Sequence, residues 1–118
     1  MASSGAGWHD RAMPNHVVVY TVRATFADAT TRQQYIDWLR DGHCLAVVRE
    51  GGAMSAEVTV LDDGAVESRY LFGSRADFDA YEAGPAQHLR ADGATRFGPA
   101  AGVQTTRALG ARAVRVPD

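Results

Sequence analysis

The sequence lacks lysine altogether, because all 12 of its basic residues are arginine. A reaction that proceeds through a Schiff base on a lysine amine is therefore excluded for this chain. Cysteine occurs once, at Cys44, so no disulfide can form within the chain and nothing indicates an oxidising compartment. The formal net charge of −2 also lacks the excess of basic residues that a nucleic-acid-binding surface requires.

Long apolar runs are absent as well. No segment approaches the ~18 consecutive apolar residues of a membrane span, and the first residues, MASSGAGWHDRAMPN, contain no hydrophobic stretch typical of a secretory signal. We therefore expect a cytoplasmic protein that binds neither membrane nor nucleic acid. The 118 residues are enough for one domain with one core.

We expect that domain to cover residues 16–109, between an N-terminal tail (1–15) and a C-terminal tail or short exchanged arm (110–118). Trp8 is unusual in a tail rich in Gly, Ala and Ser, and it either packs on the domain or a partner subunit or remains without a docking role.

The hydrophobic pattern predicts four strands and two helices. Alternation of apolar residues indicates strands over 16–26, 54–61 and 66–72, with a weaker strand over 102–109. A first helix is predicted from Asp28 or Thr30 to the Gly51-Gly52 pair, and Asp63-Gly64 is predicted to form a two-residue hairpin turn. A second helix is predicted to begin after Ser74, to break at Gly84-Pro85 and to end at Gly93 in the left-handed conformation.

The order β-α-β-β-α-β is typical of the ferredoxin-like α+β fold, a four-stranded antiparallel sheet with two helices on one face. In that fold the first and third strands are central. Their helix-free face is half apolar, and its predicted residues are Val17, Val19, Thr21, Arg23, Glu67, Arg69 and Leu71. Because a monomer would expose this face, we expect a homodimer that packs through it.

The residues with the clearest chemical potential are predicted to face the space between helices and sheet. Helical spacing places His43 on the inward side of the first helix beside Trp38, and strand alternation places Tyr20 and Tyr70 on the helix-facing side of the sheet. Together they would line one substrate pocket, with His43 as the base, the two tyrosines as hydroxyl donors and Trp38 as an aromatic wall that binds the substrate. A histidine near its reference pKa of about 6.5 is a natural proton carrier at neutral pH. The alternative is that His43 bonds a backbone carbonyl while both tyrosines fill the core.

The stretch HLRADGATRFG, residues 88–98, is interpreted as mainly structural. Arg90 is read as a cation at the end of the helix. Arg96, predicted to lie in the following turn, either binds a substrate carboxylate or pairs with an acidic residue, and His88 is a further candidate for substrate binding. The four histidines have no compact metal-ligand spacing, so no metal site is predicted. Cys44 follows His43 directly and is read as an inert thiol, not half of a dyad.

The sequence resembles the dimeric α/β-barrel superfamily and, within it, a family of small bacterial proteins of unknown function. The resemblance covers residues 16–109 and rests on YTVRATF, on Tyr35, Trp38 and His43, on Tyr70-Leu71-Phe72, on Tyr81, and on LRADGATRFG followed by Arg107. Enzymes of the superfamily usually place their pocket between sheet and helices. Its haem-degrading and quinone-forming monooxygenases rely on an asparagine in the first strand, whereas the only asparagine here, Asn15, precedes it.

These observations lead to three functional hypotheses. The first is a small-molecule-binding dimer that, as an enzyme, would be a cofactor-independent isomerase, tautomerase or monooxygenase for a carbonyl or carboxylate compound. His43 would act as base or acid, Tyr20 and Tyr70 would stabilise an enolate, and Arg96 would hold a carboxylate. The second is a non-enzymatic structural or regulatory dimer with a filled core. The third is a haem-binding protein.

Overall fold

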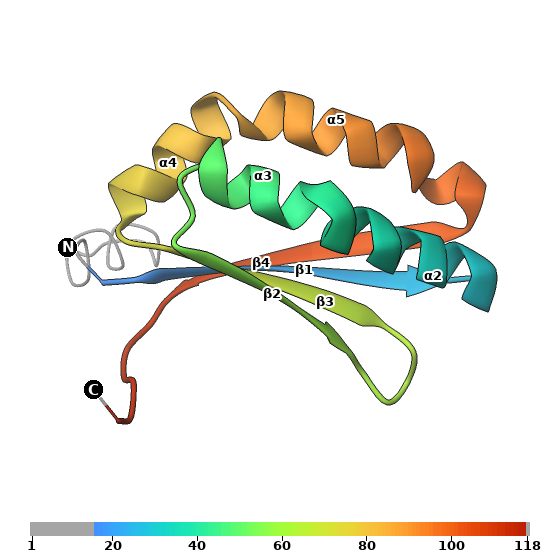
Figure 1. Ribbon diagram of the computed structural model, residues 1–118. Coiled ribbons are helices and arrows are strands. Elements are labelled where there is room, and N and C mark those ends of the chain that lie inside the picture. Colours follow the sequence, from blue (N-terminus) through green and yellow to red (C-terminus); the bar gives the residue numbers. More distant parts are fainter. Residues whose placement is uncertain (1–15, 118) are drawn as a thin grey trace, which may run out of the picture.

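The computed structural model describes residues 16–117, which form a four-stranded antiparallel sheet with all of its helices on one face (Figure 1). The strands are β1 (Val18–Phe26), β2 (Ser55–Val60), β3 (Val66–Phe72) and β4 (Val103–Ala111), in the spatial order β2-β3-β1-β4. This arrangement confirms the predicted ferredoxin-like α+β fold, with the first and third strands at the centre.

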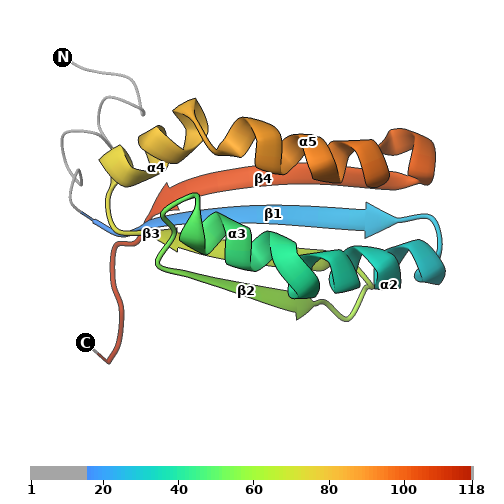
Figure 2. The same ribbon diagram turned by 45° about the horizontal axis from the view of Figure 1, so that its top comes forward.

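The helical layer consists of two chain segments that lie side by side over the sheet (Figure 2). The first contains α2 (Ala29–Trp38), a π-helical turn η1 (Leu39–His43) and α3 (Cys44–Arg49) without a break. The second contains α4 (Arg75–Ala83), α5 (Ala86–Arg96) and the short 3₁₀ turn η2 (Pro99–Ala101). No helix within residues 16–117 combines the length and the apolarity needed to cross a membrane.

The predicted helix starts are confirmed by capping hydrogen bonds. The Asp28 carboxylate accepts a hydrogen bond of 2.7 Å from the Thr31 amide, and the Ser74 hydroxyl accepts one of 3.2 Å from the Asp77 amide. Both contacts satisfy backbone donors that the first helical turn leaves without partners. The predicted break at Gly84-Pro85 separates α4 from α5.

The predicted end of the second helix and the predicted length of the hairpin turn are both wrong. Gly93 does not end the second helix, since α5 continues to Arg96. The hairpin connection is also longer than the predicted two-residue turn. The Leu61 amide donates to the Ala65 carbonyl across it, and Gly64 has a φ of +91°. Asp63 stabilises this loop by accepting a hydrogen bond from the Ala65 amide. The last strand extends to Ala111, two residues beyond the predicted end of the domain.

The core lies between the helices and the sheet, in two neighbouring clusters. The first contains Val18, Tyr20, Val47, Ala53, Tyr70, Phe72, Phe78, Tyr81, Ala86 and Leu89. The second contains Ala24, Tyr35, Leu39, Val66, Phe97 and Val103. The strand residues of both clusters follow the period of two, so the core side chains of β1 and β3 all point toward the helices.

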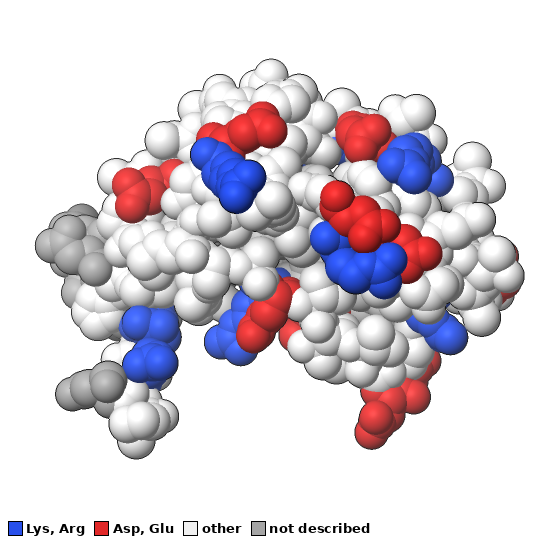
Figure 3. Space-filling view, viewed as in Figure 1, with Lys and Arg blue, Asp and Glu red and all other residues white. Residues whose placement is uncertain are grey.

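The opposite face of the sheet has no helical cover (Figure 1). Val19 and Leu71 lie directly opposite each other there, as do Arg23 and Glu67. The homodimer expected through this face stays a prediction, as does the docking of Trp8, which lies outside the described residues. In the view of Figure 3, acidic and basic side chains alternate over the surface, with no broad patch of one sign.

Candidate functional site

A π-helical turn brings two neighbouring side chains toward the interior. Between α2 and α3 the Cys44 amide bonds the Leu39 carbonyl, five residues back, instead of four. The extra residue in this turn shifts the helical rows by one position, so that both His43 and Cys44 contact interior groups. Such π-turns are rare and occur frequently at functional sites. The sequence offers only Gly42 as a local sign of the irregularity.

His43 opens onto a pocket of about 480 Å³ between the helices and the sheet. This volume lies within the range of small-molecule sites, about 300–1,000 Å³. Its buried wall is strongly aromatic and comes from both core clusters: Tyr20, Tyr35, Leu39, Tyr70, Tyr81, Phe97 and Val103. Its exposed rim comes from the end of α5, from η2 and from β4: Ala94, Pro99, Gln104, Thr105 and Arg107. The pocket is therefore apolar inside and polar at its mouth.

The His43 imidazole is held in place by Trp38. The two rings stack with their centroids 4.1 Å apart and their planes 20° from parallel. The Trp38 indole donates a 2.8 Å hydrogen bond to the Asp92 carboxylate, which ties α2 to α5. Burial lowers the pKa of His43 from 6.5 to about 4, although the negative charge of Asp92 opposes the shift. The imidazole is consequently neutral at physiological pH and can accept a proton.

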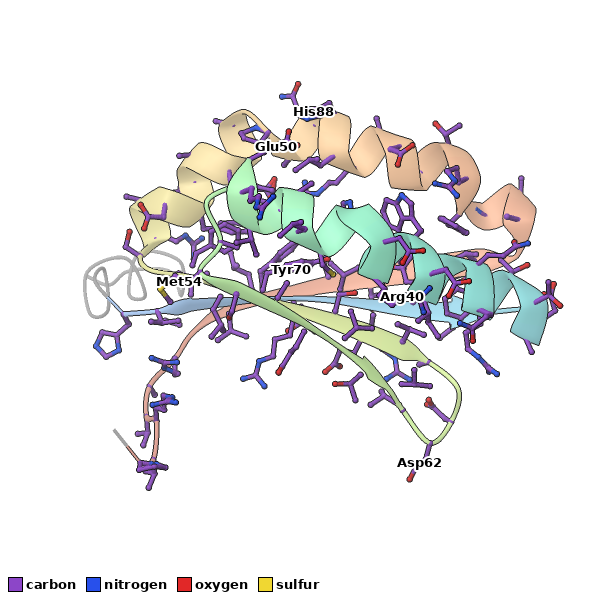
Figure 4. All side chains as sticks on the ribbon, viewed as in Figure 1. Arg40, Glu50, Met54, Asp62, Tyr70 and His88 are labelled. Atoms are coloured by element: carbon purple, nitrogen blue, oxygen red, sulfur yellow. The ribbon has the colours of Figure 1, made fainter. Side chains whose placement is uncertain are left out.

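Tyr20 and Tyr70 lie directly opposite each other on β1 and β3, with ring centroids 5.8 Å apart. Figure 4 shows Tyr70 in the space between the sheet and the helices. Burial raises the pKa of Tyr70, and Cys44 raises it further, so the phenol remains a hydrogen-bond donor at every physiological pH. Burial also raises the pKa of Cys44, whose sulfur lies 3.8 Å from the Tyr70 hydroxyl. A protonated thiol is a poor nucleophile, which agrees with the interpretation of Cys44 as inert.

Arg90 reaches into the pocket from the middle of α5. Its guanidinium donates 2.6 and 2.8 Å hydrogen bonds to the two carboxylate oxygens of Glu82, and a 2.8 Å bond to the Tyr20 hydroxyl. The same group lies over the rings of Tyr20 and Tyr81. Hydrogen bonds from Arg90 lower the pKa of Glu82. This pair therefore stays ionised, and it fixes the orientation of the Tyr20 hydroxyl.

The structure brings together some of the predicted site residues and separates others. His43, Tyr20 and Tyr70 line one pocket. Trp38, predicted as its aromatic wall, stacks on His43 but does not line this pocket. Arg96 is the last residue of α5 and lines a second, outer groove between the helices, together with Trp38 and His43. His88 lies on the outer side of the helical layer, where it contacts Glu50 at 3.1 Å (Figure 4). Neither Arg96 nor His88 lines the pocket. Arg96 belongs to the helix because α5 continues past the turn that the sequence predicted, and the side chain of His88 points away from the sheet toward Glu50.

Sequence reasoning missed the two arginines of the pocket. The sequence pattern predicts Arg90 as the cation at a helix end, whereas α5 continues for six more residues beyond it. Arg107 lies on β4 directly opposite Val22 of β1 and shares its face of the sheet. The alternation of Val103, Thr105 and Arg107 along the last strand was the signal that could have identified it. Across residues 16–117, no three His, Cys, Asp or Glu side chains come together in a group that could hold a metal ion.

Gly93 allows α5 to approach Trp38 closely, and this contact predicts a reversed substitution effect. A Cβ atom at position 93 would lie 2.7 Å from the Trp38 ring. Replacing a helical glycine by alanine ordinarily stabilises a helix by about 1 kcal/mol. Gly93→Ala should instead lower the free energy of unfolding, because overpacking costs about 1–3 kcal/mol. Urea denaturation measures the difference.

The matched control for Gly93→Ala is Gly42→Ala. A Cβ atom at position 42 would contact nothing within 4 Å, so this variant should be at least as stable as the wild type. A Gly93→Ala protein that equals or exceeds the wild type in stability would show that the Trp38 ring is not held in place.

Comparison with known proteins identifies relatives in structure only. No family model matches the chain, and no curated protein matches it in sequence. Among solved structures, the cofactor-independent oxygenase SnoaB from Streptomyces nogalater is 15% identical with a TM-score of 0.63, over 87% of this chain and 99% of that one. The monooxygenase from ActVA-Orf6 of Streptomyces coelicolor, solved with Nanaomycin D, is 18% identical with a TM-score of 0.63, over 91% and 97% of the two chains.

A third match, Rv0793 from Mycobacterium tuberculosis, is 18% identical with a TM-score of 0.61, over 85% of this chain and 98% of that one. The resemblance to small bacterial proteins of unknown function stays a prediction. At these identities the matches show a common architecture, and the chain has the ferredoxin-like α+β fold of cofactor-independent oxygenases such as SnoaB.

Proposed function

We propose that this chain is a cofactor-independent oxygenase that binds a small aromatic carbonyl compound in the pocket beside His43. One observation carries the proposal: His43, whose imidazole is neutral, lines a single aromatic-walled cavity together with Tyr20 and Tyr70. The solved structures with the same fold include a cofactor-independent oxygenase and a monooxygenase bound to Nanaomycin D, which favours oxygenation over other proton-transfer reactions.

The proposed reaction begins with proton removal. Because the first strand lacks the asparagine on which the quinone-forming monooxygenases of the superfamily rely, His43 is proposed as the base in this chain. The neutral Nε2 or Nδ1 of His43 accepts the proton of an acidic C–H bond next to the substrate carbonyl, and the electron pair of that bond forms an enolate. The Tyr70 hydroxyl donates a hydrogen bond to the enolate oxygen, and the Tyr20 hydroxyl supports it. Donors fixed before the reaction are effective at stabilising such developing charge.

The enolate then reduces dioxygen, so the substrate supplies the electrons that a flavin or metal supplies elsewhere. For anthrone as a probe, the carbanion carbon forms a bond to oxygen and gives a peroxide, which takes back the proton from His43. Loss of water then gives anthraquinone. One anthrone and one dioxygen yield one anthraquinone and one water, and no external reductant is needed.

Anthrone turnover tests the proposal directly. In air-saturated buffer, we expect the protein to accelerate oxygen uptake and anthraquinone formation in equal amounts above the spontaneous rate. In D₂O without oxygen, we expect faster exchange of the acidic C–H. Heat-denatured protein at the same concentration provides the control for the spontaneous reaction.

The same assay separates the oxygenase from an isomerase or tautomerase and from the non-enzymatic dimer. Exchange without oxygen uptake would contradict the oxygenase and favour an isomerase or tautomerase that uses the same base. Absence of both reactions, together with absence of binding, would favour the non-enzymatic dimer.

A further inference from the structure

The pocket has an unusual balance of charge. Its lining contains two arginines, Arg90 and Arg107, and no aspartate or glutamate. The positive charge of Arg90 is offset by Glu82 through two hydrogen bonds of 2.6 and 2.8 Å. Arg107 has no such partner, since no carboxylate within residues 16–117 lies within salt-bridge distance of it. Among residues 16–117, Arg90, Arg107 and Glu82 together therefore leave one net positive charge at the pocket, and the charge of Arg107 also contributes to the lowered pKa of Glu82.

Arg107 is also placed to act on a ligand. It lies on β4 at the exposed rim, opposite Val22, with Gln104 and Thr105 beside it on the same strand. Its charge influences the interior, because it opposes the rise in pKa that burial causes in Tyr35 and Tyr81. A guanidinium at the mouth of an aromatic cavity can bind an anionic group of a ligand while the apolar part of that ligand occupies the interior.

We infer that Arg107 is a specificity residue that binds a carboxylate on the substrate, so that the substrates are aromatic carbonyl compounds that also carry a carboxylate. The inference rests on the proposed function, because it takes the pocket as the substrate site. It also replaces Arg96 as the predicted carboxylate ligand, since Arg96 faces the outer groove. The planar guanidinium has donors spaced to bind both oxygens of a carboxylate.

Two matched probes test the inference by calorimetry. Anthraquinone-2-carboxylate and anthraquinone-2-carboxamide share the ring system and differ in charge. We expect the wild type to bind the carboxylate about 10-fold more tightly, as a charge-assisted hydrogen bond at a partly exposed site would give. Arg107→Gln should remove this preference and leave the affinity for the amide within about 2-fold, whereas Arg107→Lys should keep part of the preference. Arg96→Gln should keep all of it.

The outcomes distinguish failure of the carboxylate inference from failure of the proposed function. A preference for the carboxylate that survives Arg107→Gln, or that disappears in Arg96→Gln, overturns the assignment of Arg107 while the pocket remains the binding site. Equal loss of both probes in Arg107→Gln assigns Arg107 a purely structural role and also overturns it. If neither probe binds to the wild type although anthrone is turned over, the carboxylate inference fails alone. If anthrone is not turned over either, the proposed function fails with it.

Discussion

Replacing His43 by glutamine should lower kcat for anthrone oxygenation by about 10²–10⁴-fold, the range that a general base contributes. Glutamine fills a similar volume and keeps a polar group beside Trp38, but it cannot take up the proton. The affinity for the product anthraquinone should change little, because the aromatic wall of the pocket remains. Oxygen uptake under substrate saturation, with calorimetric binding of anthraquinone, measures the two effects separately.

The pH dependence of anthrone oxygenation should identify His43 as the base. Because burial lowers its pKa to about 4, activity should be level from about pH 5 to pH 8 and should fall as the pH drops through 4. The unfolded chain, in which the pKa is near 6.5, binds more protons between these values. The stability contribution of neutral His43 is therefore complete above pH 6.5 and is lost as the pH falls toward 4.

The control is His88→Gln, which removes an exposed imidazole on the outer side of the helices. This variant should retain kcat and most of the pH dependence of stability. An activity profile that falls near pH 6.5 would show that His43 titrates as an exposed group. Full activity of His43→Gln would remove it from the mechanism.

The second large effect is expected for Tyr70→Phe, which removes one hydroxyl and keeps the ring in the core. If Tyr70 donates a hydrogen bond to the enolate oxygen, kcat should fall by about 10²–10³-fold, as for loss of one oxyanion donor. The ring contacts with Tyr20 remain, so the affinity for anthraquinone should change by less than about 3-fold. Anaerobic exchange of the anthrone C–H should slow by the same factor as oxygen uptake, because both reactions pass through the enolate.

A different result would assign Tyr70 another role. If Tyr70→Phe slowed oxygen uptake but left C–H exchange unchanged, the hydroxyl would act after the enolate forms. An unchanged kcat would reduce Tyr70 to a core residue, which is the alternative that the sequence left open.

Most of the fold follows from local sequence signals. Alternation along β1 and β3 predicted which of their side chains face the helices, and capping residues Asp28 and Ser74 marked both helix starts. Gly93 was misread because a glycine near the end of a helical pattern usually ends the helix. Here the glycine is required by a contact with Trp38, 55 residues away in the chain. No local pattern carries that information.

The pocket was predictable where it depends on the direction of side chains from regular elements. Helical and strand periodicity placed His43, Tyr20 and Tyr70 toward one space, where the structure finds them. The positions of the arginines relative to the pocket were not predictable in the same way. Arg90 and Arg96 are six residues apart on one helix, and only the full length of α5 shows that the first faces the sheet and the second the outer groove.

A crystal structure with anthraquinone-2-carboxylate bound is the most direct test that the pocket beside His43 is the ligand site. We expect the rings to lie between β1, β4 and α5, with a carbonyl oxygen at the Tyr70 hydroxyl and the carboxylate at Arg107. A ligand in the outer groove beside Arg96, or a cavity closed by side chains with no ligand in it, would contradict the assignment of this pocket as the ligand site.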